Sequence, residues 1–544
     1  MKKQLSILIF LMTALQPGLH AQDTMRIDVL KPFIATLGEA IKIQSNPNPE
    51  IPVVVNDTFV YPTPVIERVD IPTAYTIKPL SLGTSLLPKL KNNYVRLGYG
   101  NYNTPLIELY LNTTRNRNYQ AGAFVKHLSS SPSDGRKFSN NTVSTFGKRF
   151  INKSVLEGDL MFHQNVVNRY GFAFPDGSYN AAANSPGNTA TENVYSLLQF
   201  QTAFSNVLKD TSKLGYDLRA VYYRFGTNYD LHEDDFRLSG TFQQSVQGNP
   251  LQVITALQTN SIVHSVTSNT YSRVFVDIHP TYRLLIDRAY LMVGFNSTFF
   301  NDSNGTKFLF FPQAELGYKL IPNSITAYAG FTGGLQRHTL RSLTTENPFL
   351  RGFVLNNTVN QFEMYIGLKG IISPQTSFVM EASLATIRNM VFYAADSLLN
   401  QQAVVYDPSK AGLSRIKAEL NHEFGEQFRF GFVMQYFGYD LSITAPYSRP
   451  TFTTALNVLY AIGSKFNLRT EFFTMNKRTG LQLPSNMEYA LKGLVDINAG
   501  LDYRYNRNVK VFLNINNLTN NEYQRWLNLP VLGINVVGGL GITF

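Results

Sequence analysis

The last eleven residues of the sequence, INVVGGLGITF from Ile534 to Phe544, carry the pattern that decides the fold. Counted backwards in twos, the residues of one face are Phe544, Ile542, Leu540, Gly538, Val536 and Ile534, nearly all of them apolar. The other face holds small or polar residues, apart from Val537. Because side chains alternate between the two faces of a strand, the stretch predicts an amphipathic β-strand. A single strand of this kind fits a soluble β-sandwich as well as a membrane barrel.

The same period of two runs through the chain from Asn92 onwards. Val95, Leu97 and Tyr99, for example, alternate with Arg96. Followed along the sequence, the alternation gives about 22 strand candidates. They lie at 92–100, 103–114, 117–129, 137–151, 152–166, 192–206, 213–226, 234–248, 250–264, 271–286, 288–300, 307–320, 321–336, 359–372, 374–386, 411–424, 427–440, 450–463, 464–475, 491–505, 508–517 and 534–544.

The connections between these candidates alternate in length. Tight turns occur at sites such as Pro322–Ser324 and Gly463–Lys465. The longer polar stretches between the turns are 168–193, 337–359, 387–410, 476–489 and 520–533. Outer-membrane barrels have tight turns in the periplasm and long loops outside, whereas a soluble sandwich has no reason for this order. We therefore predict an all-β fold, a transmembrane antiparallel β-barrel over residues 92–544, in which the short first hairpin, Gly100–Thr104, departs from the rule.

The polar face of the predicted strands is expected to line the lumen. A charged side chain facing lipid costs several kcal/mol near the bilayer midplane, so charged residues that alternate with apolar ones must point inward. The lumen-facing candidates are Arg96, Glu108, Asp496, Asn498, Asp502 and Arg504. The sequence thus predicts a wet, charged lumen.

Two segments precede the predicted barrel. Residues 1–21 carry Lys2 and Lys3, an apolar run too short to span a bilayer and a plausible cleavage site after Ala21, the pattern of a secretory signal peptide. Residues 22–91 hold nine prolines, which fix φ and remove backbone donors too often for a packed core. We predict that residues 22–91 form an extended periplasmic arm that partly occludes the lumen.

Composition argues against several classes of function. The chain has no cysteine, which removes disulfides, thiolate metal sites and a lipidated N-terminal cysteine. Lys and Arg are scattered singly rather than clustered, so no nucleic-acid groove is expected. No histidine is placed with a serine or carboxylate as an activated pair. We expect no enzymatic activity.

One acidic run, His232–Asp235, is a candidate for calcium binding through its carboxylates. We expect it instead to be a solvated loop, and we predict neither a metal site nor a cofactor.

Two stretches resemble a known family. The segment from Asn514 to Tyr523, NINNLTNNEY, followed by the strand that ends at Phe544, resembles the C-terminal end of TonB-dependent receptors. The strand count is similar to theirs, and the terminal aromatic strand resembles the signal read when outer-membrane barrels are assembled. That resemblance assigns Leu540, Ile542 and Phe544 to the assembly signal. Residues 94–129 resemble the first strands of plugless receptor-like barrels from Bacteroidota.

The resemblance implies a place in the cell, partners and a function. We expect a protein of the Gram-negative outer membrane, in contact with its lipids, that acts as a receptor or in solute transport, with a lipoprotein or periplasmic protein as candidate partner. TonB-dependent receptors carry a large plug domain, which residues 22–91 are too short to form, and this argues against TonB coupling. The alternative is a non-conducting scaffold subunit of an outer-membrane assembly or secretion complex.

Overall fold

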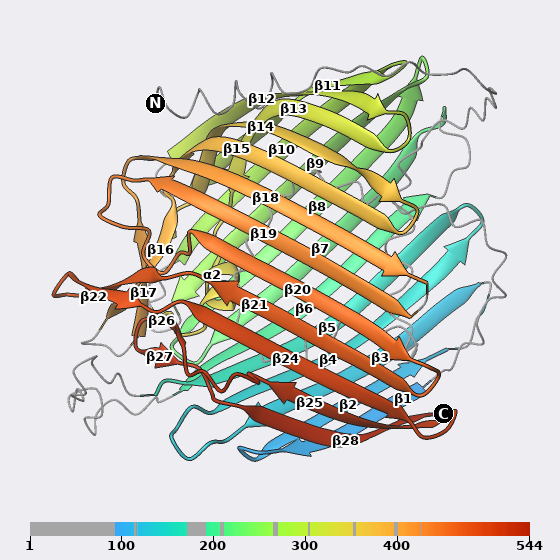
Figure 1. The fold of residues 1–544 in the computed structure, drawn as a ribbon. Helices are drawn as coiled ribbons and strands as arrows, with labels where there is room; N and C mark the ends of the chain where they lie inside the picture. Colours follow the sequence, from blue (N-terminus) through green and yellow to red (C-terminus); the bar gives the residue numbers. More distant parts are fainter. Residues whose placement is uncertain are drawn as a thin grey trace, which may run out of the picture. The chain divides into compact units, whose positions relative to one another are not determined.

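The computed structural model describes residues 93–544, except 114–115, 117, 171–191, 207–211, 265–269, 303–304, 352–354, 397–400 and 426. The predicted signal peptide and arm lie outside the described residues. Within the described part, 22 strands form a single antiparallel sheet in which each barrel strand pairs with the next one along the chain (Figure 1).

The barrel strands vary in length around the wall. Their bounds are β1 (Asn93–Gly100), β2 (Thr104–Asn112), β3 (Tyr119–Ser130), β4 (Phe138–Ile151), β5 (Ser154–Asn168), β6 (Glu192–Asn206), β7 (Gly215–Thr227), β8 (Leu231–Val246), β9 (Asn249–His264), β10 (Thr270–Ile286), β11 (Ala289–Asp302), β12 (Gly305–Ile321), β13 (Ile325–Gln336), β14 (Thr358–Ser373), β15 (Thr376–Arg388), β18 (Lys410–Phe424), β19 (Phe428–Asp440), β20 (Phe452–Ile462), β21 (Phe466–Met475), β24 (Leu494–Arg504), β25 (Val509–Asn516) and β28 (Asn535–Thr543).

Strand β28 closes the barrel. It pairs with β25 on one side and with β1 on the other, both antiparallel, and Leu97 lies opposite Leu540 in the second pairing. The backbone N–H of Asn93 donates to the carbonyl of Phe544 at 3.1 Å, and the reverse bond is 3.0 Å long. Closure leaves the barrel sheet without a free edge, as a membrane-spanning sheet requires. The predicted 22-stranded antiparallel barrel is confirmed.

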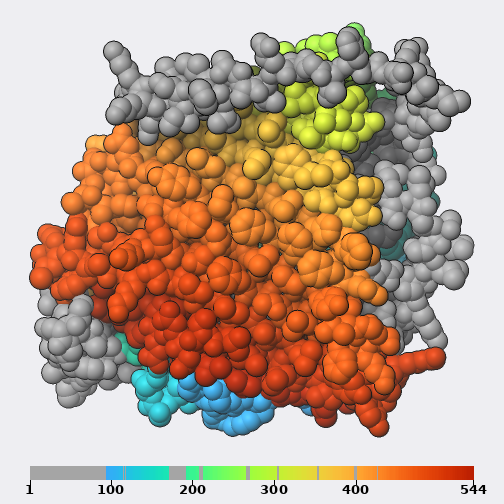
Figure 2. All heavy atoms as spheres, in the orientation of Figure 1, coloured from blue at the N-terminus to red at the C-terminus, as the bar shows by residue number. Residues whose placement is uncertain are grey.

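The two faces of the wall differ as a membrane barrel requires. Leu97 and Leu540 are 52% and 51% exposed on the outer face, whereas Arg96, on the opposite face of β1, is 4% exposed. Figure 2 shows the C-terminal strands, coloured orange to red, as one continuous outer surface. Exposed leucine, isoleucine and phenylalanine side chains recur around the wall, because the solvent on that side is lipid.

The two ends of the barrel are built differently. At the turn end, where β1 begins and β28 ends, tight turns place residues such as Asn323 and Asp287 at positive φ, which Asn and Asp tolerate. The long connections all lie at the other end, the loop end. Not every connection at the loop end is long, however. Asn228–Asp230 join β7 to β8, and the short first hairpin joins β1 to β2.

The long loops contain secondary structure that the sequence did not reveal. The elements are α2 (Leu340–Glu346), β16 (Val391–Asp396), β17 (Gln401–Tyr406), β22 (Arg478–Leu483), β23 (Met487–Leu491), β26 (Gln524–Trp526) and β27 (Leu529–Pro530). Four of these strands form a second sheet in the order β17-β16-β22-β23, with β16 and β22 parallel. Among the described residues, no helix has the length and apolar character needed to cross a membrane.

The prediction of a loop at His232–Asp235 is wrong. These residues lie in β8, where Glu233 is fully buried on the inner face and Asp234 lies on the outer face. A run of polar residues hides the period of two, because both faces carry polar side chains at this height of the wall. The described residues contain no group of His, Asp and Glu side chains arranged to hold a metal ion.

Candidate functional site

The inner wall at the barrel seam carries two of the predicted lumen residues in contact. Arg96 lies opposite Glu108 in the β1–β2 register, with Nη1 3.6 Å from Oε2. Its guanidinium also lies 3.8 Å from the ring centroid of Phe512, and its Nη2 donates to Asn514 at 3.4 Å. Hairpin pairing therefore neutralises this arginine on the wall itself.

Asp502 joins the same wall through an arginine that the sequence analysis missed. Arg469 Nη2 lies 3.3 Å from Asp502 Oδ1 and 3.4 Å from the side-chain oxygen of Asn514. Arg469 is on β21, where it alternates with apolar Leu468. That alternation was the available signal. Arg96, Asp502 and Asn514 thus form one connected polar patch.

The other predicted residues lie elsewhere on the wall. Asp496 accepts a hydrogen bond from the Tyr523 hydroxyl at 2.6 Å, and Asn498 accepts one from the backbone N–H of Asn517 at 2.9 Å. Both contacts go to the loop between β25 and β28. Arg504 lies at the turn end of β24, opposite Lys510. The structure therefore spreads the predicted set over the height of the barrel rather than gathering it into one pocket.

A second polar patch, absent from the predictions, lies on strands β11 to β18. Glu315 accepts hydrogen bonds from the hydroxyls of Tyr290 at 2.5 Å and Tyr365 at 2.9 Å, and Lys369 lies 3.7 Å away. On the neighbouring strands Arg415 contacts two glutamates. The side chains of Lys369 and Arg415 are 21% and 26% exposed, so the inner wall is charged and partly accessible to water.

Five loops pack together at the loop end into a folded unit that we call the cap. It comprises the described residues of 337–357, 389–409, 441–451, 476–493 and 517–534. Its core contains Leu350, Tyr393 and Trp526, all buried, and the rings of Tyr393 and Trp526 meet edge to face with centroids 4.8 Å apart. The cap therefore has an apolar core of its own, distinct from the barrel wall.

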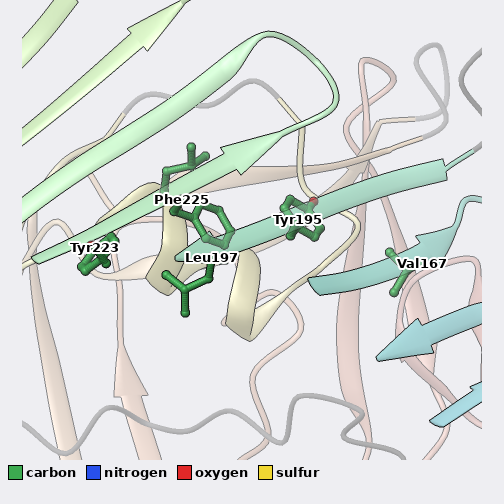
Figure 3. Packing of buried hydrophobic residues seen from close by; sticks show 6 residues of the cluster. Val167, Tyr195, Leu197, Tyr223 and Phe225 are labelled. Atoms are coloured by element: carbon green, nitrogen blue, oxygen red, sulfur yellow. The ribbon is translucent and has the colours of Figure 1, made fainter. Parts of the chain in front are cut away.

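Helix α2 carries the cap across to a distant part of the wall. The helix belongs to the loop between β13 and β14, yet Leu340 packs in one cluster with inward side chains of β5, β6 and β7. Figure 3 shows Tyr195, Leu197 and Phe225 of this cluster. Glu233 of β8 accepts a hydrogen bond from the Leu340 backbone N–H at 2.6 Å, at the N-terminus of the helix. Strands β5 to β8 are not neighbours of β13 and β14 in the sheet, so the loop that carries α2 reaches over the mouth to another part of the wall.

Polar contacts complete the anchoring on this side. Arg341 Nη1 donates to Gln199 Oε1 of β6 at 2.9 Å, and Asn193 Nδ2 donates to the carbonyl of Pro348 at 2.9 Å. The loop between β25 and β28 is held from the N-terminal wall by Arg136, which donates to the carbonyl of Val531 at 2.5 Å. The cap thus bridges the mouth of the barrel from several directions.

A buried histidine makes the stability of the cap depend on pH. His338 Nε2 lies 2.8 Å from the Thr358 hydroxyl, and burial lowers the pKa of His338 to about 4. An unfolded histidine titrates near pH 6.5. Between these values the folded state binds fewer protons than the unfolded state, so stability is lost as pH falls from about 6.5 to about 4, by about 2–3 kcal/mol.

The measurement for His338 uses the single tryptophan, Trp526, which lies in the cap core. We expect the midpoint denaturant concentration for the change in Trp526 emission to be lower at pH 5 than at pH 7.5. In His338→Gln, which keeps a polar group beside Thr358, this drop should be smaller. An equal drop in the variant would assign the pH dependence to groups other than His338.

The sequence matches no model of a protein family and no curated protein. Solved structures do match. The FrpB iron transporter from Neisseria meningitidis (F3-3 variant) is 10% identical, with a TM-score of 0.64 over 84% of this chain and 82% of that chain. The fold is that of the TonB-dependent receptors. The siderophore receptor PiuA from Acinetobacter baumannii gives a TM-score of 0.62 at 11% identity, over 84% of this chain and 82% of that chain.

A third match extends the likeness to a receptor that holds its ligand. The ferripyoverdine receptor of the outer membrane of Pseudomonas aeruginosa, bound to ferripyoverdine, is 12% identical over 85% of this chain and 72% of that chain, with a TM-score of 0.61. The expectation of a barrel like that of TonB-dependent receptors is confirmed for the fold. The plugless state, the Bacteroidota source and the argument against TonB coupling stay predictions.

Proposed function

We propose that the protein is a receptor or transport barrel of the Gram-negative outer membrane that admits a polar solute through its lumen. The observation that carries the proposal is the inner wall, where charged side chains of a closed barrel are partly accessible to water. A barrel filled by a packed apolar core has no use for such a wall. The fold shared with iron and siderophore receptors supports the same class of function.

The predicted lumen residues take roles within this proposal. Asp502, whose side chain is 22% exposed, would contact solute or water at the seam. Arg96 and Glu108 are buried beside it and would shape the wall, with Arg504 nearer the turn end. Asp496 and Asn498 would instead hold the loop between β25 and β28, because their printed partners are Tyr523 and the backbone of Asn517. A lipoprotein or periplasmic protein remains the candidate partner that couples cap movement to uptake.

A second function, a non-conducting scaffold subunit, is favoured by one observation. The core of the cap is fully buried at Leu350 and Tyr393, and a mouth sealed by so complete a core suits a barrel that conducts nothing. Complexes purified with native partners and reconstituted into liposomes separate the two functions. We expect these liposomes to swell in a polar solute faster than protein-free liposomes. Absence of flux, together with assembly-machinery subunits in the complex, would favour the scaffold.

The predicted arm has a narrower role to fill than its sequence implies. Residues 22–91 lie outside the described residues, and their partial occlusion of the lumen stays a prediction, with the cap bridging the mouth at the other end. We propose that the arm acts at the turn end, beneath the lumen. Deleting residues 24–88 and comparing conductance in planar bilayers tests this: unchanged conductance would assign closure to the cap alone.

A further inference from the structure

Three arginines and one carboxylate meet in the interior of the cap. Arg449 lies in the loop between β19 and β20, Arg478 begins β22 and Arg525 is in β26. Glu346, at the end of α2, bonds to Arg449 at 2.5 Å and accepts a hydrogen bond from the Tyr393 hydroxyl at 2.6 Å. The carboxylate is therefore already engaged, and it balances one of the three positive charges.

Arg478 and Arg525 are buried without a carboxylate bonded to either in the described part of the cap. They are 5% and 6% exposed. Arg478 donates to the backbone carbonyls of Arg525 at 2.6 Å and Gln524 at 2.7 Å, so its side chain lies against the backbone of β26 and its charge acts on the Arg525 guanidinium. Nε of Arg478 and Nη2 of Arg525 are buried and make no hydrogen bond in the structure.

Burial of this kind is unfavourable unless something supplies negative charge. Desolvation lowers the pKa of both guanidinium groups, because the surroundings disfavour their charged form. Buried charges in proteins are normally paired, and a guanidinium offers the planar donors that match phosphate and carboxylate oxygens. Three residues after Arg525, both polar side-chain atoms of Asn528 are also buried and make no hydrogen bond in the structure.

We propose that Arg478 and Arg525 form a binding site in the cap for a phosphate or carboxylate group. The unpaired Nη2 of Arg525 and Nε of Arg478 donate to the oxyanion, which neutralises the excess charge around Glu346. This proposal rests on the proposed function in one respect: the solute that carries the anion would be the one that the barrel admits. Binding itself requires no transport, so it is measured independently of conduction.

The single tryptophan of the chain reports on this site. The guanidinium carbon of Arg525 lies 5.4 Å from the ring centroid of Trp526, so an anion bound at Arg525 alters the surroundings of the indole. Purified full-length protein in detergent is titrated with sodium phosphate and sodium acetate, each against sodium chloride at equal ionic strength. We expect a saturable change in emission with phosphate or acetate and a linear, smaller change with chloride.

Variants assign the response to the proposed residues. Arg525→Gln and Arg478→Gln should each weaken binding by about tenfold or more, and Arg525→Lys should weaken it less. The control is Arg219→Gln, the same change on β7, where Arg219 lies 3.7 Å from Asp217. Folding of each variant is checked by heat-modifiable gel migration.

The outcomes separate the proposal from its alternatives. Glucose 6-phosphate, compared with glucose, shows whether the anion is accepted as part of a larger solute or as a free ion. A saturable response that is retained in both glutamine variants would overturn the proposal. So would the absence of any saturable response to phosphate or acetate in the unmodified protein. If the glutamine variants do not fold, the comparison of phosphate with chloride in the unmodified protein, together with Arg525→Lys, still decides.

Discussion

Replacing Tyr393 by alanine is expected to convert a closed barrel into one that conducts ions. Tyr393 is fully buried in the cap, its ring packs against Trp526, and its hydroxyl donates to Glu346 at 2.6 Å. Removing a buried aromatic side chain costs about 3–5 kcal/mol, and here the loss also removes one of the two side chains bonded to Glu346, leaving Arg449. This is comparable to the total stability of a small folded unit, so the cap should open for a measurable fraction of the time.

Single-channel recordings in planar bilayers measure this effect. We expect rare or no openings in the unmodified protein and frequent openings of large conductance in Tyr393→Ala. The matched control is Tyr99→Ala, the same substitution on the outer face of β1, where the side chain is 62% exposed. Equal conductance in all three proteins would show that the cap does not limit passage through the barrel.

Replacing Leu540 by arginine is expected to lower the amount of assembled barrel severely. Leu540 is exposed on the outer face of β28 and lies opposite Leu97 across the seam where the barrel closes. Arginine on a lipid-facing position costs about 2–4 kcal/mol near the midplane. The substitution also falls within the proposed assembly signal of Leu540, Ile542 and Phe544, so both insertion and closure should suffer.

The fraction of heat-modifiable protein in outer membranes reports the result. We expect a decrease of about tenfold or more, given the cost of the buried charge, while Leu540→Phe, which keeps an apolar side chain, stays near the unmodified level. Normal assembly of the arginine variant would mean that this part of β28 faces something other than lipid. Truncation of Phe544 tests the assembly signal at a second position, with Leu540 and its contact with lipid retained.

The barrel could be predicted from the sequence because the patterns that specify its strands and turns are local. Period-two alternation makes each strand visible, and tight turns carrying Asn or Asp, such as the one at Asn323, set where each strand stops. The pairing of Arg96 with Glu108 follows from the same logic, since both residues belong to one hairpin. Closure of β28 onto β1 was predictable because a membrane sheet has no alternative to closing.

The cap could not be predicted from the sequence, because contacts between distant loops determine its structure. Tyr393 and Trp526 come from loops far apart in the sequence, and neither loop has a periodic pattern long enough to reveal its short strands. The contact of Glu233 with the backbone N–H of Leu340 is indicated by nothing near Glu233 in the sequence. Arg478 and Arg525 likewise stand out only once their burial and missing partners are known.

If the loops of this chain close their own barrel, helix α2 must lie against β6 in the assembled protein. The chain has no cysteine, so Arg341→Cys with Gln199→Cys introduces the only two thiols, at positions whose native side chains are in contact, with Arg341 Nη1 2.9 Å from Gln199 Oε1. A short bismaleimide should link them efficiently within one chain, and Arg341→Cys with Gln244→Cys, near the turn end of β8, should stay unlinked. Failure of the first pair to cross-link in correctly assembled, heat-modifiable protein would show that α2 does not reach β6, and that the mouth is not bridged as described.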